Sequence, residues 1–187
     1  MKPIFICIPT TKERRGRLLE CLSLIHINTG YPHIEVIYEN YREGFVGPIH
    51  KILAGLNPDT LVWCIGDDTA IVEPDTLKRL VAALEDPSWV VQPDDGIQHG
   101  NIITMPLCTA ETMRKYTYKG YFLNFADREF TDIMTKEGRY KYHPEIKVEH
   151  MHPAVKKAPM DETYAYAQTK FNDDRLLYEE RKKNNYE

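Results

Sequence analysis

The chain has 187 residues, 42% of them hydrophobic and 11% aromatic, with a formal net charge of −4 and a pI near 6.0. This length and apolar content suffice for one hydrophobic core, so we expect a single domain. The acidic balance and interspersed charges exclude a general nucleic-acid-binding surface, while leaving room for a local basic groove.

Export and membrane insertion are not expected. The apolar run at residues 4–8 is too short for a signal peptide, and no later run approaches the length of a membrane span. We therefore expect a cytoplasmic protein. Its four cysteines, Cys7, Cys21, Cys64 and Cys108, are widely spaced, which predicts buried thiols instead of disulfides or a zinc site.

The first half of the chain alternates strand-like apolar runs with helical patterns. Strands are predicted at residues 4–8, 34–38 and 61–65. Helices are predicted from an apolar face of Leu18, Leu19, Leu22 and Ile25, from residues 49–56, and from Leu77, Leu80, Val81 and Leu84. Strands and helices in this alternation imply right-handed parallel crossovers. We therefore expect an α/β fold, a three-layer α/β/α sandwich with a mostly parallel, Rossmann-like sheet.

The second half is less regular. Strands are predicted at 89–92, 102–107, 139–142 and 146–150. Helices are predicted at 109–116 and at 127–136, the latter ended by Gly138. A terminal helix is expected within the polar segment after residue 160, where one apolar stripe lets it pack on the domain.

Two adjacent acids, Asp67 and Asp68, follow the buried strand at 61–65, before a helix start at 73–75. In open α/β sheets ligands bind at the carboxyl ends of the strands. Carboxylate oxygens there suit a divalent cation and a phosphate. The pair could equally be a solvated turn with an Asx cap.

Three further residues could carry chemistry. His150 and His152 alternate on a predicted strand, so both rings could approach one ligand, although paired histidines are also common on surfaces. Asp127 opens a helix, where a carboxylate could serve as a general base or simply as an N-cap. Glu129 and Asp132 are weaker candidates for the same role.

Basic, acidic and aromatic segments elsewhere have two interpretations each. Lys12, Arg14, Arg15, His50 and Lys51 could contact nucleotide phosphates or lie on solvated helix faces. The acids at 94–95 could border a substrate or form a turn. The aromatic segment 116–125 could stack on an acceptor or fill the core.

Four landmarks, spread over residues 3–153, resemble nucleotide-sugar glycosyltransferases of the GT-A fold, in particular the large inverting family-2-like group in its small, stand-alone phage or bacterial form. They are Pro9-Thr10-Thr11, Glu39, Asp67-Asp68-Thr69 with Pro74 and Leu77, and Asp127 followed by Gly138 and Glu149-His150-Met151-His152. The third residue of the DxD-like motif is Thr69, which implies either a shifted ligand, Asp68, or weaker metal binding.

The resemblance implies a hexosyl or pentosyl transfer from a nucleoside diphosphate sugar to an acceptor hydroxyl, with Mn²⁺ or Mg²⁺ as cofactor. Nucleotide-sugar contacts are expected from Pro9, Thr10, Thr11, Glu39, Lys51, Asp67 and Asp68. Metal ligands are expected from Asp68, His150 and His152, and Asp127 is the expected general base of an inverting reaction. The acceptor is left open among a small molecule, a glycan, a protein and a modified nucleic-acid base.

This resemblance also divides the single domain. Residues 1–95 form the nucleotide- and metal-binding half, residues 96–155 the acceptor and catalytic half, and residues 156–187 a helical tail. Nucleotidylyltransferases and P-loop hydrolases are disfavoured because no glycine-rich loop follows the first strand. A metal-dependent phosphoester hydrolase and an inactive nucleotide-sugar-binding module remain alternatives.

Overall fold

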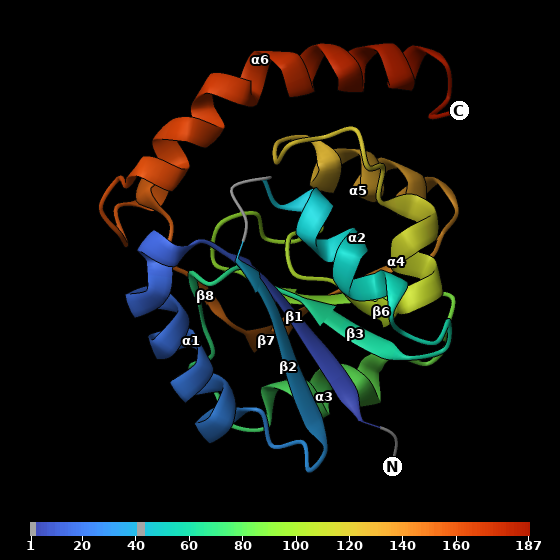
Figure 1. Cartoon of the computed structure of the whole chain (residues 1–187). Helices are drawn as coiled ribbons and strands as arrows, with labels where there is room; N and C mark the ends of the chain where they lie inside the picture. Colours follow the sequence, from blue (N-terminus) through green and yellow to red (C-terminus); the bar gives the residue numbers. More distant parts are fainter. Residues whose placement is uncertain (1–2, 41–43) are drawn as a thin grey trace.

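A six-stranded sheet lies at the centre of the protein (Figure 1), seen in a computed structural model that describes residues 3–40 and 44–187, without the side chains of residues 39, 40 and 116. Its strands are β1 (Ile4–Thr10), β2 (Ile34–Asn40), β3 (Leu61–Cys64), β5 (Val90–Asp94), β6 (Leu107–Thr109) and β7 (Tyr140–Lys147). The spatial order is β2-β1-β3-β6-β5-β7. β6 runs antiparallel to both of its neighbours, and the other pairs are parallel.

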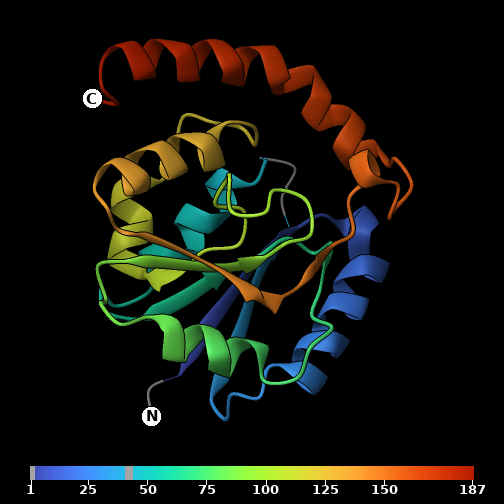
Figure 2. The same ribbon diagram turned by 180° about the vertical axis from the view of Figure 1, so that it is seen from behind.

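The helices cover both faces of this sheet. They are α1 (Arg15–Asn28), α2 (Val46–Ala54), α3 (Thr76–Ala83), α4 (Ala110–Tyr116), α5 (Ala126–Lys136) and α6 (Glu162–Lys183), with short 3-10 helices at Lys12–Arg14 and Pro153–Val155. Figures 1 and 2 show α1 and α3 on one face and α2, α4 and α5 on the other. The mostly parallel, three-layer α/β sandwich expected from the sequence is thereby confirmed.

Alternation along the strands builds a core on each side. Ile4, Ile6 and Ile8 of β1 pack with Leu18 of α1 and the buried face of α3, and Cys7 packs with α2, α4 and α5 on the opposite face. Successive strand residues point to opposite faces, so one buried strand serves both cores. All four cysteines are buried free thiols, as predicted.

Three local predictions are wrong. β7 continues through residues 143–145, where the sequence predicts a break between two strands. In α1, Leu19 is 56% exposed and Cys21 is buried in its place. Most of the strand predicted at 102–107 is a loop, because the buried side chain of Gln92 binds the backbone of this segment. The Gln92 amide oxygen accepts from the N–H groups of Thr104 and Met105 at 2.7 and 3.1 Å, and its NH₂ group donates to the carbonyl of Ile102 at 2.7 Å. These bonds replace a strand ladder.

A small antiparallel pair of strands lies beside the main sheet. β4 (Thr69–Ala70) pairs with β8 (Glu149–His150), so that Thr69 lies opposite His150. This pairing brings the segment after β3 against the segment after β7, although about 80 residues of chain separate them.

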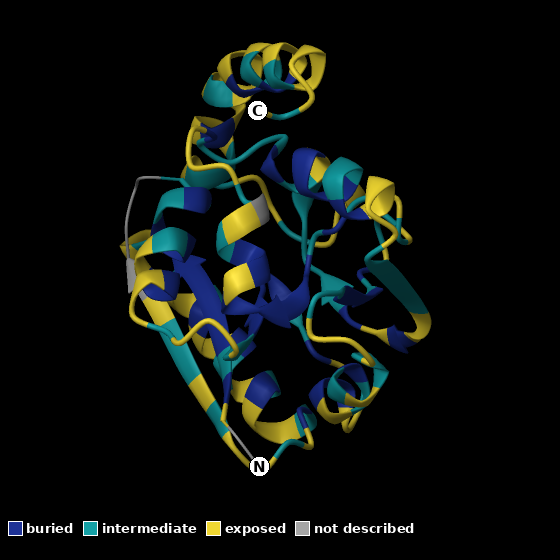
Figure 3. Ribbon diagram, turned by 90° about the vertical axis from the view of Figure 1, so that its right-hand side faces the viewer, coloured by how far each residue is buried: buried dark blue, intermediate teal, exposed yellow. Residues whose placement is uncertain are grey.

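The long helix α6 crosses above α5 at the carboxyl edge of the sheet (Figure 1), and Figure 3 shows that much of its surface is exposed. Its main anchor is the buried carboxylate of Asp174, which accepts hydrogen bonds from the backbone N–H groups of Phe122, Leu123 and Asn124 at 2.9, 3.1 and 2.8 Å. A second anchor is the ion pair of Arg181 with buried Glu129, at 2.9 Å. Among the described residues, no helix is long and apolar enough to cross a membrane.

Replacing Asp174 by alanine should lower the free energy of unfolding by about 2–3 kcal/mol, because three backbone donors lose a charged acceptor. Urea denaturation followed by circular dichroism measures the change. The exposed neighbour Asp173 is the matched control, and Asp173→Ala should change stability by less than about 0.5 kcal/mol. Equal losses in the two variants would contradict the anchoring role.

Candidate functional site

A cavity of about 970 Å³ opens at the carboxyl ends of β1 and β3. It brings together most of the residues that the sequence singled out: Pro9, Thr10, Thr11, Asp67, Asp68, Asp127, His150 and His152 all line it. This is the position at which open α/β sheets bind ligands. Asp127 therefore lies in the same cavity as Asp67 and Asp68, although Asp67 and Asp127 are 60 residues apart in the chain.

Asp67 is held from two sides and is 2% exposed. Its Oδ2 accepts a hydrogen bond from the Thr10 hydroxyl at 2.6 Å, and its Oδ1 lies 2.8 Å from Nη1 of Arg14. Burial raises the pKa of Asp67 to about 6, against the opposing effects of Arg14 and Thr10. Thr10 ends β1 and Asp67 follows β3, so this carboxylate joins the ends of two adjacent parallel strands.

Asp68 is the most heavily engaged acid of the cavity. Its Oδ2 accepts a hydrogen bond from the Tyr164 hydroxyl and lies 3.3 Å from Nε2 of His150 and 3.6 Å from Nη2 of Arg14. Its backbone carbonyl accepts from the N–H of Met151 at 2.7 Å. Burial would raise the pKa of Asp68, but His150, Tyr164 and Arg14 together hold it well below the ordinary value, so the group is ionised.

The two histidines differ in their surroundings. Burial lowers the pKa of His150, but the hydrogen bond and charge of Asp68 raise it above the ordinary value. Burial and the neighbouring His150 lower the pKa of His152, whose Nδ1 accepts from the Ala154 N–H at 3.1 Å and whose ring packs edge-on against Tyr164. His150 therefore faces Asp68 directly, and His152 caps the 3-10 helix that follows.

Asp127 lies in the first turn of α5, on the cavity wall and half-buried. Phe125, in a left-handed conformation, is the N-cap residue, so Asp127 is not the cap. Its Oδ1 accepts from the N–H of Arg128 at 2.8 Å, and burial raises its pKa. Both weaker candidates have structural partners: Glu129 binds Arg181, and Asp132 accepts from Tyr178 at 2.7 Å.

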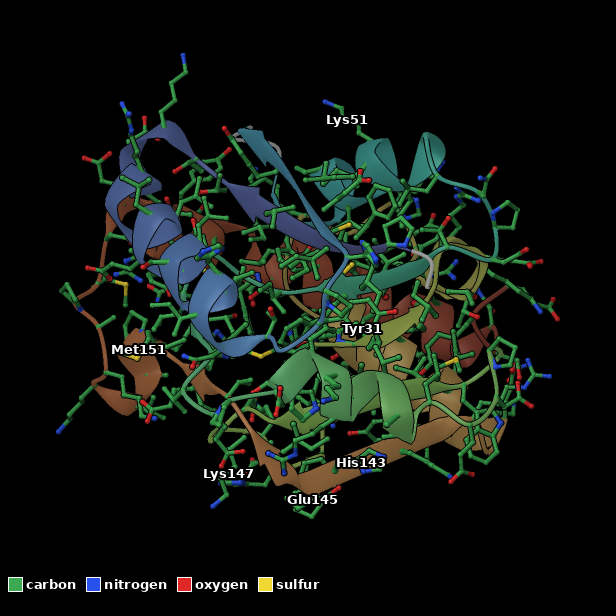
Figure 4. The ribbon with its side chains drawn as sticks, turned by 90° about the horizontal axis from the view of Figure 1, so that it is seen from below. Tyr31, Lys51, His143, Glu145, Lys147 and Met151 are labelled. Carbon is green, nitrogen blue, oxygen red and sulfur yellow. The ribbon has the colours of Figure 1, made fainter. Side chains whose placement is uncertain are left out.

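Other predicted contacts lie elsewhere. Lys51 is exposed on α2, because that helix turns its apolar residues into the core, and Figure 4 shows Lys51 pointing outward. It is not among the residues that line the cavity. The side chain of Glu39 lies outside the described residues. Asp95 is fully buried and accepts from the N–H groups of Ile97 and Gln98, so it shapes its own loop.

The aromatic segment forms part of the cavity wall and also binds α6. Phe122 packs on Tyr166 with ring centres 5.4 Å apart, and Phe125 packs on Phe171 at 5.2 Å. All four rings line the cavity. The two interpretations of this segment, substrate wall and core, are therefore compatible.

The sequence missed one cluster of the site, at the start of α6. Arg14 and Arg17 both donate to the Tyr164 hydroxyl, at 3.0 and 3.2 Å, and both lie within 3.4 Å of the Asp161 carboxylate. Asp161 is the N-cap of α6, with its Oδ1 accepting from the N–H of Tyr164 at 3.0 Å. An aspartate before a polar helix signals a cap. Arg14 is among the basic residues that the sequence offers as phosphate contacts, but no local pattern predicts its contacts with Asp161 and Tyr164 or the part played by Arg17.

A metal ion fits two of the predicted ligands. Over residues 3–40 and 44–187, no three His, Cys, Asp or Glu side chains gather in a way that could hold a metal. Mg²⁺-like ions, however, commonly take only one or two protein ligands and complete their shell with water and phosphate oxygens. Adjacent ligands of an octahedral ion at roughly 2.1 Å are roughly 3 Å apart, and Asp68 Oδ2 and His150 Nε2 are 3.3 Å apart.

Comparison with known proteins identifies a shared fold. No protein-family model matches the sequence, and no curated protein matches it. A solved structure of similar fold is the mannosyltransferase PcManGT from Pyrobaculum calidifontis, in complex with GDP-Man and Mn²⁺, with a TM-score of 0.62 and 14% identity. The similarity covers 87% of this chain and 59% of the mannosyltransferase. The chain therefore has a glycosyltransferase fold, a GT-A-like sandwich.

Removing the Tyr164 hydroxyl should weaken the contact between α6 and the acids of the cavity. Tyr164→Phe is expected to lower the free energy of unfolding by about 1–2 kcal/mol, because a buried carboxylate loses a hydrogen bond. Urea titration measures this change. Tyr166→Phe is the control, since Tyr166 lines the same cavity but is 49% exposed, and it should be neutral. A Tyr164→Phe protein as stable as the parent would show that the contact contributes nothing.

Proposed function

We propose that this protein is a metal-dependent glycosyltransferase that moves a sugar from a nucleoside diphosphate sugar to an acceptor hydroxyl. The supporting observation is that Asp68, His150 and Asp127 line one cavity at the carboxyl edge of a GT-A-like sheet. A cation site and a separate carboxylate in one cleft are what this reaction requires. The similarity in fold to a mannosyltransferase solved with GDP-Man and Mn²⁺ supports the same assignment.

In the donor half of the proposed site, Asp68 and His150 would hold Mn²⁺ or Mg²⁺, with His152 beside them. Pro9, Thr10 and Thr11 border the nucleotide at the end of β1. Asp67, fixed by Thr10 and Arg14, supports the position of Asp68. A bound divalent ion would neutralise the charge of the leaving diphosphate.

In the acceptor half, Asp127 acts as general base. Its carboxylate takes the proton of the acceptor hydroxyl as the oxygen bonds to the anomeric carbon, and the bond from that carbon to the diphosphate oxygen breaks. Attack opposite the leaving group inverts the configuration. Burial raises the pKa of Asp127, which makes its carboxylate a stronger base than an ordinary aspartate.

A panel of sugar nucleotides with Mn²⁺ tests the proposed activity. Slow donor hydrolysis or transfer should release free nucleoside diphosphate, and EDTA or Asp68→Ala should abolish the release. Release of nucleoside monophosphate, or of inorganic phosphate from simple esters, would instead indicate the phosphoester hydrolase. Nucleotide binding without any turnover would indicate an inactive binding module.

Substituting the proposed base separates binding from chemistry. Asp127→Asn should reduce kcat by about 10²–10⁴-fold, the usual contribution of general base catalysis, and leave donor affinity nearly unchanged. Turnover assays and calorimetric titration with a nucleoside diphosphate and Mn²⁺ measure the two quantities. Asp173→Asn, on the exposed side of α6, is the control. Parent-like turnover of Asp127→Asn would remove the base assignment.

A further inference from the structure

The guanidinium of Arg14 lies among three carboxylates at the edge of the cavity. It is 2.8 Å from Asp67, 3.6 Å from Asp68 and 3.4 Å from Asp161, and its side chain is 11% exposed. The coulombic effect of these acids raises the pKa of Arg14 despite burial, so the group is a permanent cation. In the protein without ligand, Arg14 therefore supplies positive charge at the acids assigned to the donor site.

The first turn of α6 holds this cation in place. Cζ of Arg14 lies 4.7 Å from the centre of the Tyr164 ring, in cation–π geometry, and Nη2 donates to the Tyr164 hydroxyl at 3.0 Å. Thr163 and Thr11 make a further hydroxyl contact at 3.4 Å. Nε of Arg14 is buried and makes no hydrogen bond among the described residues, although it lies 3.4 Å from the Asp161 carboxylate. One donor of the guanidinium is therefore unused in this arrangement.

Binding of a metal-nucleotide would change this charge balance. A divalent ion on Asp68 would lie within a few ångströms of the Arg14 guanidinium, and two cations at that distance repel each other. The diphosphate arrives with the ion and carries several negative charges. A planar guanidinium matches phosphate oxygens in bidentate geometry, so the displaced Arg14 has a stronger partner within reach.

We propose that Arg14 takes the place of the cation at Asp67 and Asp68 in the free protein and becomes a diphosphate-binding residue when the metal-nucleotide binds. This exchange rests on the proposed donor site and adds a binding residue to it. It has an unusual consequence: Arg14 opposes binding of the metal alone and favours binding of the nucleotide. A residue with a merely structural role would affect both in the same direction.

Arg14→Gln and Arg15→Gln form a matched pair, because they remove the same charge from neighbouring residues and Arg15 is exposed. Binding of Mn²⁺ alone is measured at pH 8 by electron paramagnetic resonance of the free ion. Binding of GDP and of UDP in excess Mn²⁺ is measured by calorimetry. Arg14→Gln should bind Mn²⁺ alone about tenfold more tightly and the nucleotide about tenfold more weakly, whereas Arg15→Gln should match the parent in both.

Circular dichroism checks that each variant is folded. If Arg14→Gln does not fold, Arg14→Lys is used to test the exchange. Lysine keeps the charge but loses the bidentate fork, so Arg14→Lys should bind Mn²⁺ like the parent and the nucleotide several-fold more weakly. Changes of the same sign in both affinities, or none, would overturn the exchange and leave the proposed function standing. A parent that binds neither nucleotide with Mn²⁺ would overturn the proposed function, and the exchange with it.

Discussion

The site depends on one buried carboxylate, that of Asp68, and on the groups that keep it ionised. A charged carboxylate away from water is costly unless donors and cations surround it. Tyr164, His150 and Arg14 do so here, and they come from the end, the late middle and the beginning of the chain. The pairing of β4 with β8 places His150 in this shell, since Thr69 lies opposite it. A change that moves any of these three segments would leave the Asp68 carboxylate exposed to water or buried without its partners.

The C-terminal segment is consequently part of the site and not merely a tail. Tyr164 contacts Asp68, and Tyr166 and Phe171 further along the same helix line the same cavity. Further along, Asp174 fixes the backbone just before α5, the helix that carries Asp127. The helix α6 therefore contacts both the proposed donor half of the site and the segment that leads into α5, which carries the proposed base Asp127. It holds the two halves in position relative to each other.

Local patterns predicted most elements, because the periods of strands and helices are set by nearby residues. The buried run at 61–65 and the apolar spacing of Leu77 and Leu80 are examples. The loop at 102–106 was mispredicted because a single buried side chain, Gln92, supplies its hydrogen bonds. Contacts such as those between Arg14 and Tyr164 join residues 150 positions apart, and no local period encodes them. Asp68, His150 and Asp127 are singled out because acids and histidines at strand ends and helix starts suggest chemistry. Arg14 is one of several basic residues that could contact phosphates, and its sequence does not distinguish it from the others.

A crystal structure with Mn²⁺ and either GDP or UDP tests the central claim most directly. The account predicts electron density for one ion that contacts Asp68 and His150, a diphosphate bound to that ion, and the Asp127 carboxylate facing the same cavity across the space left for the sugar. Nucleotide bound elsewhere on the protein, or an ion held by residues other than Asp68 and His150, would contradict it.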